Sequence, residues 1–211
     1  MPKMLNYRQE KRLTAHINRR VTQSVFRAFD YATAIGTPLN LYAVINLHET
    51  VAASATTIFE IVRHKYRDWL NYRSKKRPEG VAPPMYVYAM ENPTGDHPHV
   101  NWAIHVPEGL RSEFEAKLPR WIARAQGHCG HSDCVIQPIK QDTHKTLAKY
   151  IVKGTDPNFI GHFYLENVHA AQGQIWGKRA GVSPSLGATV RKVVNFKPRR
   201  RQPQEDWRAA A

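Results

Sequence analysis

Apolar residues follow strand-like and helix-like patterns in turn along most of the chain. Residues 38–47 alternate and are rich in β-branched and aromatic types, which predicts a strand. Residues 56–72 place apolar side chains on one side at helical spacing, which predicts a helix. The later segments predict strands over 85–91, 99–106 and 135–139, and helices over 108–125 and 143–152. This β-α-β-β-α-β order predicts an α+β fold, an antiparallel sheet with helices packed on one face.

The strand expected over 99–106 has two chemically different faces. Side chains alternate between the two faces of a sheet, so every second residue points the same way. The apolar set is Val100, Trp102, Ile104 and Val106, and the other set is His99, Asn101, Ala103 and His105. We therefore expect the first face to lie in the core and the second to be polar and rich in imidazole.

Charge and proline mark the boundaries of one folded domain. Residues 1–35 are basic and predict an N-terminal arm or helix packed at the domain edge. Residues 36–195 are expected to form the domain, and the basic segment 196–211 to be a disordered tail. Pro138 has no N–H to donate to a neighbouring strand, so the strand over 135–139 is expected at an edge of the sheet.

The charge balance favours a polyanionic partner. The formal net charge is +14 and the isoelectric point is about 10.0. Because neutralising phosphates releases condensed counterions, such a chain is expected to bind nucleic acid. A solubility surface, a membrane-surface protein and a ribosome-associated protein are the alternatives that charge alone leaves open. No apolar run approaches the ~20 residues needed to span a bilayer, so no membrane partner is expected.

The N-terminus and the cysteines both favour a cytoplasmic location. The opening sequence MPKMLNYRQEKRL lacks the apolar stretch of a secretory signal. Cys129 and Cys134 are too few for a disulfide framework. A reducing, cytoplasmic setting is therefore expected.

The segment from Glu91 to Asn101 brings metal-binding residue types together. A hairpin centred near Gly95 would place Glu91 opposite His99 on the neighbouring strand. Asn101 lies two residues beyond His99 and points from the same face. A carboxylate, an imidazole and an amide oxygen would then converge on a hard or borderline cation. The alternative is that His99 and Asn101 are polar residues on a solvated face, and His97 is expected in the turn.

A tyrosine and a lysine stand three residues apart in the last predicted helix. This spacing puts the Tyr150 phenol and the Lys153 ammonium on one helical face. Beside a metal ion, the phenol can act as an oxygen nucleophile toward phosphorus, and the ammonium offsets charge at the phosphate or phenolate. Taken alone, such a pair is more often the exposed side of an ordinary amphipathic helix.

Together, these segments resemble the HUH endonuclease superfamily, and most of all its rolling-circle replication initiators. In that family a glutamate precedes a strand that reads Pro, His, a bulky apolar residue and His. Glu91, Pro98 and His99 reproduce its spacing. The family's later motif is similar to Tyr150-Ile-Val-Lys-Gly-Thr-Asp156. The resemblance covers residues 38–155, and its single tyrosine is typical of replication initiators rather than of relaxases with paired tyrosines.

The resemblance implies a ferredoxin-like or RRM-like nuclease core that nicks and rejoins single-stranded DNA at a plasmid or phage replication origin. Tyr150 would be the nucleophile and would become linked to a 5′-phosphate, with Lys153 assisting. Glu91, His99 and Asn101 would bind Mg²⁺ or Mn²⁺, although most members have a second histidine at the position of Asn101. A host replication helicase would be a further partner. The alternatives are a transposase or relaxase with the same chemistry, and a non-catalytic single-stranded nucleic-acid-binding protein.

Other basic and imidazole side chains are candidates for contacts with DNA. These are His97 in the turn, His105 farther along the polar strand face, and Lys178 and Arg179. For the last two, a solvated basic surface is an equal alternative. The loop from His128 to Cys134 contains zinc-capable residue types, but their spacing matches no common zinc pattern, so free thiols are expected there.

Overall fold

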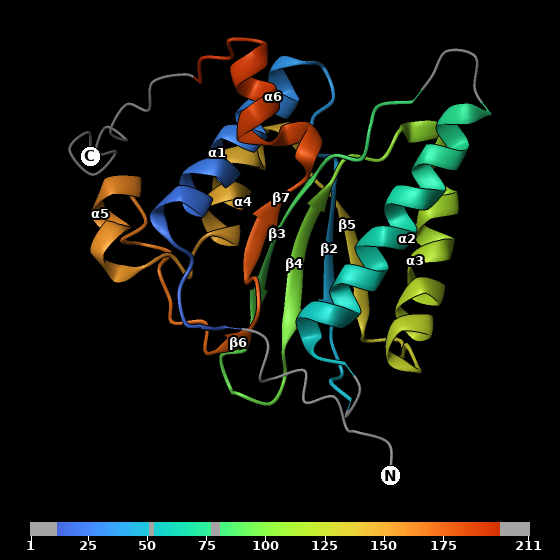
Figure 1. The fold of residues 1–211 in the computed structure, drawn as a ribbon, viewed down its shortest axis with the longest axis horizontal. Helices are drawn as coiled ribbons and strands as arrows, with labels where there is room; N and C mark the ends of the chain where they lie inside the picture. The colour runs from blue at the N-terminus through green and yellow to red at the C-terminus, as the bar shows by residue number, and fades with distance from the viewer. Residues whose placement is uncertain (1–11, 51–52, 77–80, 199–211) are drawn as a thin grey trace, which may run out of the picture.

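A five-stranded antiparallel sheet runs through the centre of the molecule (Figure 1). The computed structural model describes residues 12–50, 53–76 and 81–198. The strands stand in the order β5-β2-β4-β3-β7, and each neighbouring pair is antiparallel. Their bounds are Leu41–Asn46 for β2, Tyr86–Glu91 for β3, His99–Ile104 for β4, Cys134–Pro138 for β5 and Ala180–Val182 for β7. The antiparallel α+β fold is confirmed, and β5 with its proline lies at an edge, as predicted.

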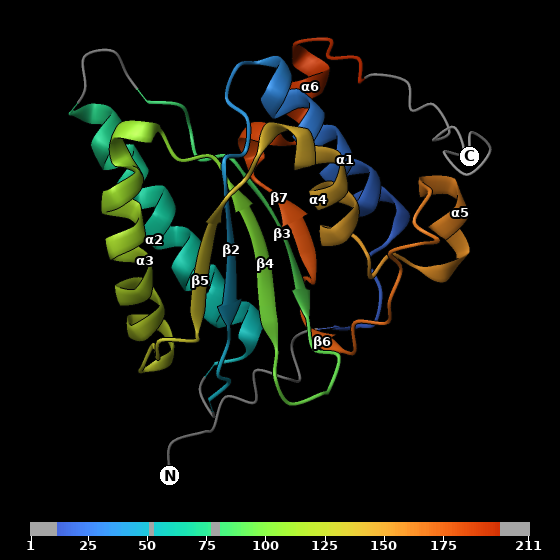
Figure 2. The ribbon, with the colours of Figure 1, turned by 180° about the vertical axis from the view of Figure 1, so that it is seen from behind.

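Helices cover both faces of this sheet (Figures 1 and 2). The two crossover helices, α2 (Ala55–Lys75) and α3 (Arg111–Gln126), lie on one face. The other face is covered by α1 (Arg19–Ala34) and α4 (His144–Ile151). The prediction that the helices share one face is therefore wrong. The physical reason lies in β3, which is buried along its whole length and so needs an apolar cover on both sides.

The first core lies between the sheet and the α2–α3 pair. It contains the apolar set predicted for β4, namely Val100, Trp102, Ile104 and Val106. The Trp102 ring makes edge-on contacts with Phe59 and Tyr66 of α2, at centroid distances of 5.3 and 5.4 Å. Such T-shaped contacts place the positive edge of one ring against the negative face of another. This packing leaves the opposite face of β4 to His99 and Asn101.

The second core lies between the sheet and helices α1 and α4. Helix α1 begins after Asn18, whose side-chain oxygen accepts the N–H of Val21 at 3.0 Å. Its buried residues are Thr22, Val25, Phe26, Ala28, Phe29, Tyr31 and Ala32. The apolar members of this set form one cluster with residues of β3, β4 and α4. Within the segment 1–35, residues 19–34 are therefore a helix of the same folded unit as the sheet, while residues 1–11 lie outside the described residues.

Short elements complete the described chain. Strands β1 (Leu13–Thr14) and β6 (Ile175–Trp176) pair antiparallel, and α5 (Ile160–Phe163) and α6 (Ala188–Val193) are single short helices. The 3₁₀ segments are Glu108–Leu110, Gln141–Thr143, Pro157–Phe159 and Pro184–Leu186. Among the described residues, every helix is too short or too polar to cross a membrane. Most of the expected tail, residues 199–211, lies outside the described residues.

Candidate active site

The hairpin between β3 and β4 sets the position of two candidate metal ligands. Gly95 in the connecting turn has a φ of 94°, a left-handed value that favours glycine because it has no Cβ. The two strands then run in register from Tyr86 opposite Ile104 to Glu91 opposite His99. The predicted pairing of Glu91 with His99 is confirmed.

Glu91 is buried between an imidazole and an ammonium. Its side chain is 3% exposed, and its Oε2 lies 3.1 Å from Nε2 of His99 and 3.0 Å from Nζ of Lys153. The other carboxylate oxygen, Oε1, is buried and has no hydrogen-bond partner among the described residues. A buried carboxylate oxygen in this state costs free energy unless a cation or a donor reaches it. Oε1 is therefore the oxygen through which Glu91 could hold a cation.

Lys153 connects this carboxylate with Tyr150. Helix α4 ends at Ile151, so Lys153 lies just beyond the helix and not on it as predicted. Its backbone N–H donates to the Tyr150 carbonyl at 3.2 Å, which continues the last turn two residues past the end of the helix. Its Nζ lies 3.7 Å from the centre of the Tyr150 ring, within the range of a cation–π contact. One ammonium therefore contacts both the phenol ring and Glu91.

The turn that carries Lys153 is tightly packed. A Cβ placed on the next residue, Gly154, would lie 2.8 Å from Cγ of Gln172, so only glycine fits without displacing its neighbour. The Gly154 carbonyl accepts the N–H of Ile17 at 2.8 Å. The Lys153 carbonyl accepts the N–H of Ala170 at 3.2 Å. These contacts hold the backbone on both sides of the turn and thereby aim the ammonium at Glu91.

Asn101 projects from the same face of β4 as His99 and is 1% exposed. Its Oδ1 accepts a hydrogen bond from the Tyr42 hydroxyl, and its Nδ2 is buried without a hydrogen-bond partner among the described residues. If the side-chain amide of Asn101 were rotated by 180°, Nδ2 would donate to the Tyr42 oxygen and Oδ1 would point into the site. Burial raises the pKa of Tyr42 well above its ordinary value, and the proximity of Tyr150 and Glu91 raises it further.

Tyr42 is a site residue that the sequence analysis did not identify. It lies on β2, directly opposite Ala103, and faces away from the α2–α3 core, as Asn101 does on β4. The alternation along residues 38–47 contained this signal, because position 42 falls between two core positions. Pairing of β2 with β4 was needed to connect Tyr42 with Asn101.

Arg179 is buried at 3% exposure, which contradicts its predicted contact with DNA. Its guanidinium donates to the carbonyls of Met90 and Thr14, at 3.2 and 2.9 Å, and to those of Gln172 and Gly173. Burial lowers the pKa of Arg179 to about 10, although nearby Glu91 acts in the opposite direction. The side chain therefore keeps its charge at neutral pH and ties three chain segments together behind Glu91.

The other predicted DNA contacts differ in their accessibility. The His97 side chain is 80% exposed in the turn, with its Nε2 3.5 Å from Asp96 Oδ2. Lys178 is exposed. His105 is half-buried just past the far end of β4, where its Nδ1 lies 2.7 Å from the Pro38 carbonyl and burial lowers its pKa. His97 and Lys178 are thus open to a ligand, whereas His105 is engaged within the fold.

The donor set of this site suits a small divalent cation. Glu91 supplies a carboxylate with a buried, unpaired oxygen, His99 an imidazole nitrogen and Asn101 an amide oxygen. Oxygen-rich sets of this kind fit Mg²⁺ or Mn²⁺. A scan against known protein families finds no match, and no curated protein matches the chain.

Proposed function

We propose that the chain is a nicking enzyme of HUH type for single-stranded DNA, with one catalytic tyrosine, which acts in the replication of a plasmid or phage. The observation that carries this proposal is the position of the Lys153 ammonium, 3.0 Å from Glu91 Oε2 and 3.7 Å from the centre of the Tyr150 ring. It joins an accessible phenol to a buried carboxylate that has an unpaired oxygen. The net charge of +14 favours a polyanionic substrate.

The order of the strands supports this proposal. The elements β2, α2, β3, β4, α3 and β5 follow one another as β-α-β-β-α-β, and their strands stand in the order β5-β2-β4-β3. Both crossover helices lie on one face, as in a ferredoxin-like fold. The opposite face bears Glu91, His99 and Asn101, and α4 supplies Tyr150 above it. This arrangement fits the ferredoxin-like nuclease core that the resemblance to HUH nucleases implies.

The proposed reaction is a transesterification at phosphorus. The Tyr150 Oη–P bond forms as the P–O3′ bond of the DNA breaks, which yields a 5′-phosphotyrosine and a free 3′-hydroxyl. The phenolic proton leaves to solvent, and the departing 3′ oxygen takes up a proton. Because one phosphodiester replaces another, attack by a 3′-hydroxyl in the reverse direction rejoins the strand.

Each neighbouring side chain has a role in this reaction. Lys153 offsets the negative charge that develops on the phenol oxygen and the phosphate. A divalent cation held by Glu91, His99 and Asn101 would polarise the scissile phosphate.

The surface beside the site offers contacts for the DNA strand. The exposed His97 is available to phosphates. Lys178 is exposed as well, but its ammonium lies near the ring of Tyr88, on the face of the sheet that α2 and α3 cover. A hollow of about 330 Å³ borders the β3–β4 turn and includes Trp176, and an indole ring is suited to stacking with a base. Asn92 and Pro98, which line the hollow, are the neighbours of Glu91 and His99 in the chain.

The experiment is the detection of a covalent adduct. Purified protein is incubated with a library of labelled single-stranded oligonucleotides and Mn²⁺, and the products are separated on a denaturing gel. We expect an adduct that EDTA and Tyr150→Phe both abolish. Tyr72→Phe is the matched control: Tyr72 is 56% exposed and has Lys76 Nζ 5.7 Å from its ring centre, but it lies on α2, across the sheet from Glu91. This variant is expected to keep the adduct.

Two results would contradict the proposal. An adduct that persists in Tyr150→Phe would mean that another group is the nucleophile. Binding of DNA by the wild type without any adduct across the library would favour a non-catalytic binding protein. In that case Asn101→His tests the cause, because it restores the second imidazole typical of the family.

A further inference from the structure

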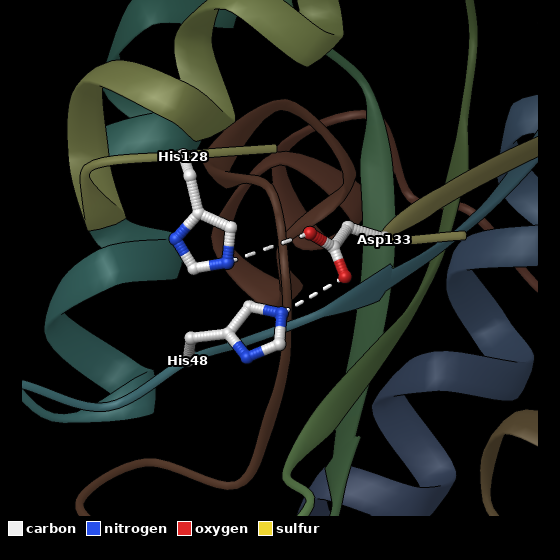
Figure 3. A group of neighbouring side chains, drawn as sticks. All are labelled: His48, His128 and Asp133. Atoms are coloured by element: carbon white, nitrogen blue, oxygen red, sulfur yellow. Dashed lines mark hydrogen bonds and ion pairs between the residues drawn. The ribbon is translucent and has the colours of Figure 1, made fainter. Parts of the chain in front are cut away.

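A second cluster of metal-binding side chains lies where three segments meet at the β5 edge of the sheet (Figure 3). His48 follows the end of β2 by two residues, and Asp133 directly precedes β5. His128 follows Gly127, which ends α3 with a left-handed φ of 93°. Figure 3 shows the two imidazoles facing the carboxylate, one toward each of its oxygens. None of these residues belongs to the site around Glu91. That site includes His99 on β4, and β2 lies between β4 and β5.

Asp133 is the fixed member of this cluster. Its side chain is 9% exposed, and its Oδ2 accepts the N–H of Gly130 at 2.6 Å. Its own carbonyl accepts the N–H of Asn46 at 2.9 Å, which ties it to β2. Backbone hydrogen bonds therefore fix the position of Asp133, which presents Oδ1 to His48 and Oδ2 to His128.

The two histidines complete a three-ligand arrangement. Nε2 of His48 lies 2.8 Å from Oδ1 of Asp133, and Nε2 of His128 lies 3.8 Å from Oδ2. The three candidate ligand atoms lie within 4.8 Å of one another. Metal–ligand bonds of about 2.0–2.1 Å in a tetrahedral zinc site place ligand atoms roughly 3.3 Å apart. The His128 side chain is 59% exposed, so rotation of its ring can close the difference.

We infer that His48, His128 and Asp133 form a second metal site, one that binds Zn²⁺ or a similar late first-row divalent cation with water in the remaining position. Two imidazoles and one carboxylate are a ligand set that zinc accepts, whereas Mg²⁺ prefers oxygen donors. An ion there takes the place of the hydrogen bond between His48 and Asp133. It thereby joins the end of β2, the end of α3 and the start of the edge strand β5.

The neighbouring thiols are not part of the inferred ligand set. Cys134 packs against the core beneath α2 and α3, and Sγ of Cys129 lies 3.8 Å from the Gly130 carbonyl. Both cysteines are free. This geometry explains why the residue spacing within the loop 128–134 matches no zinc pattern: one ligand, His48, comes from a segment 85 residues away from Asp133.

The test is a titration of the metal-free, full-length protein with Co²⁺, followed by its visible absorption, and a parallel measurement of thermal unfolding with Zn²⁺. We expect the wild type to bind one equivalent with the absorption of a tetrahedral site, and Zn²⁺ to raise its unfolding midpoint. His128→Ala is expected to weaken binding at least tenfold and to abolish the shift. This residue is exposed, so the variant should fold, which its circular dichroism checks.

Three further variants locate the ion. His131→Ala changes an exposed histidine of the same loop and is expected to bind as the wild type does. Asp133→Asn retains an oxygen for the Gly130 N–H and is expected to lose binding. Glu91→Gln alters only the other site and is expected to retain it. Unchanged binding in His128→Ala would overturn the inference, because the pair of His48 and Asp133 would then be only an ion pair. Loss of the absorption in Glu91→Gln would also overturn it.

Discussion

Replacement of Lys153 by methionine tests the electrostatics of the candidate active site. The Lys153 side chain is 13% exposed and its Nζ lies 3.0 Å from Oε2 of Glu91, whose side chain is 3% exposed. Methionine matches the apolar part of the lysine side chain as far as Cε but lacks the ammonium that contacts Glu91 and the Tyr150 ring. The buried carboxylate then retains His99 as its direct partner.

The expected loss follows from the distance and the burial. Two unit charges 3.0 Å apart attract by about 5.5 kcal/mol at an effective dielectric constant of about 20. Part of this attraction offsets the desolvation of the ammonium, and removing one member of a buried pair costs about 3–5 kcal/mol. Because His99 and the nearby Arg179 still compensate Glu91, we expect about 3 kcal/mol, at the lower end of that range. For a domain of this size, that loss lowers the unfolding midpoint by about 6–12 °C.

The assay is thermal unfolding of four proteins in EDTA: wild type, Lys153→Met, Glu91→Gln and the double variant. The double variant is expected to recover at least half of the loss, because no uncompensated carboxylate remains. Addition of Mn²⁺ should raise the midpoint of Lys153→Met more than that of the wild type, since its charge replaces that of the ammonium.

Two outcomes would refute this reasoning. A loss below about 1 kcal/mol for Lys153→Met in EDTA would show that the pair behaves like an exposed one, despite its burial. A double variant that is no more stable than Lys153→Met would show that the missing charge is not the cause of the loss.

Three other substitutions test the framework of the site. Gly173→Ala should lower the free energy of unfolding, measured by chemical denaturation, by more than about 2 kcal/mol. Gly173 has a φ of +62°, and a Cβ there would lie 1.7 Å from the Asn92 carbonyl oxygen. A variant as stable as the wild type would contradict this prediction. Arg179→Met should unfold at a markedly lower temperature, because it leaves buried carbonyls unpaired; loss of DNA affinity at full stability would instead support a direct contact with DNA. His105→Gln should flatten the pH dependence of stability. Burial lowers the pKa of His105 in the folded state, so the unfolded chain binds more protons as the pH falls below about 6.5, and the free energy of unfolding declines there. If His105→Gln shows the same decline in stability at acidic pH as the wild type, this reasoning is wrong.

Local patterns were sufficient to predict much of the sheet and part of the candidate site. The two faces of β4 and the pairing of Glu91 with His99 depend only on a period of two and one short hairpin, so they are readable from adjacent residues. The closeness of Tyr150 and Lys153 was likewise predictable from their spacing of three residues, although Lys153 lies beyond the end of α4 and not on the helix. For the same reason, the antiparallel α+β fold could be predicted from the order of its elements.

Contacts between distant segments depended on how the strands and helices pack. Tyr42 meets Asn101 across a separation of 59 residues, and His48 meets Asp133 across 85, only because β2 lies between β4 and β5. Local spacing did not predict that Arg179 is buried, because an arginine looks the same in the sequence whether water or another segment surrounds it. Nor did it predict that α1 and α4 cover the second face of the sheet, because an amphipathic helix has the same pattern whichever segment it packs against. The periodicity of a segment shows which of its sides is apolar. It does not show which other segment packs against that side, because this depends on contacts between residues far apart in the chain.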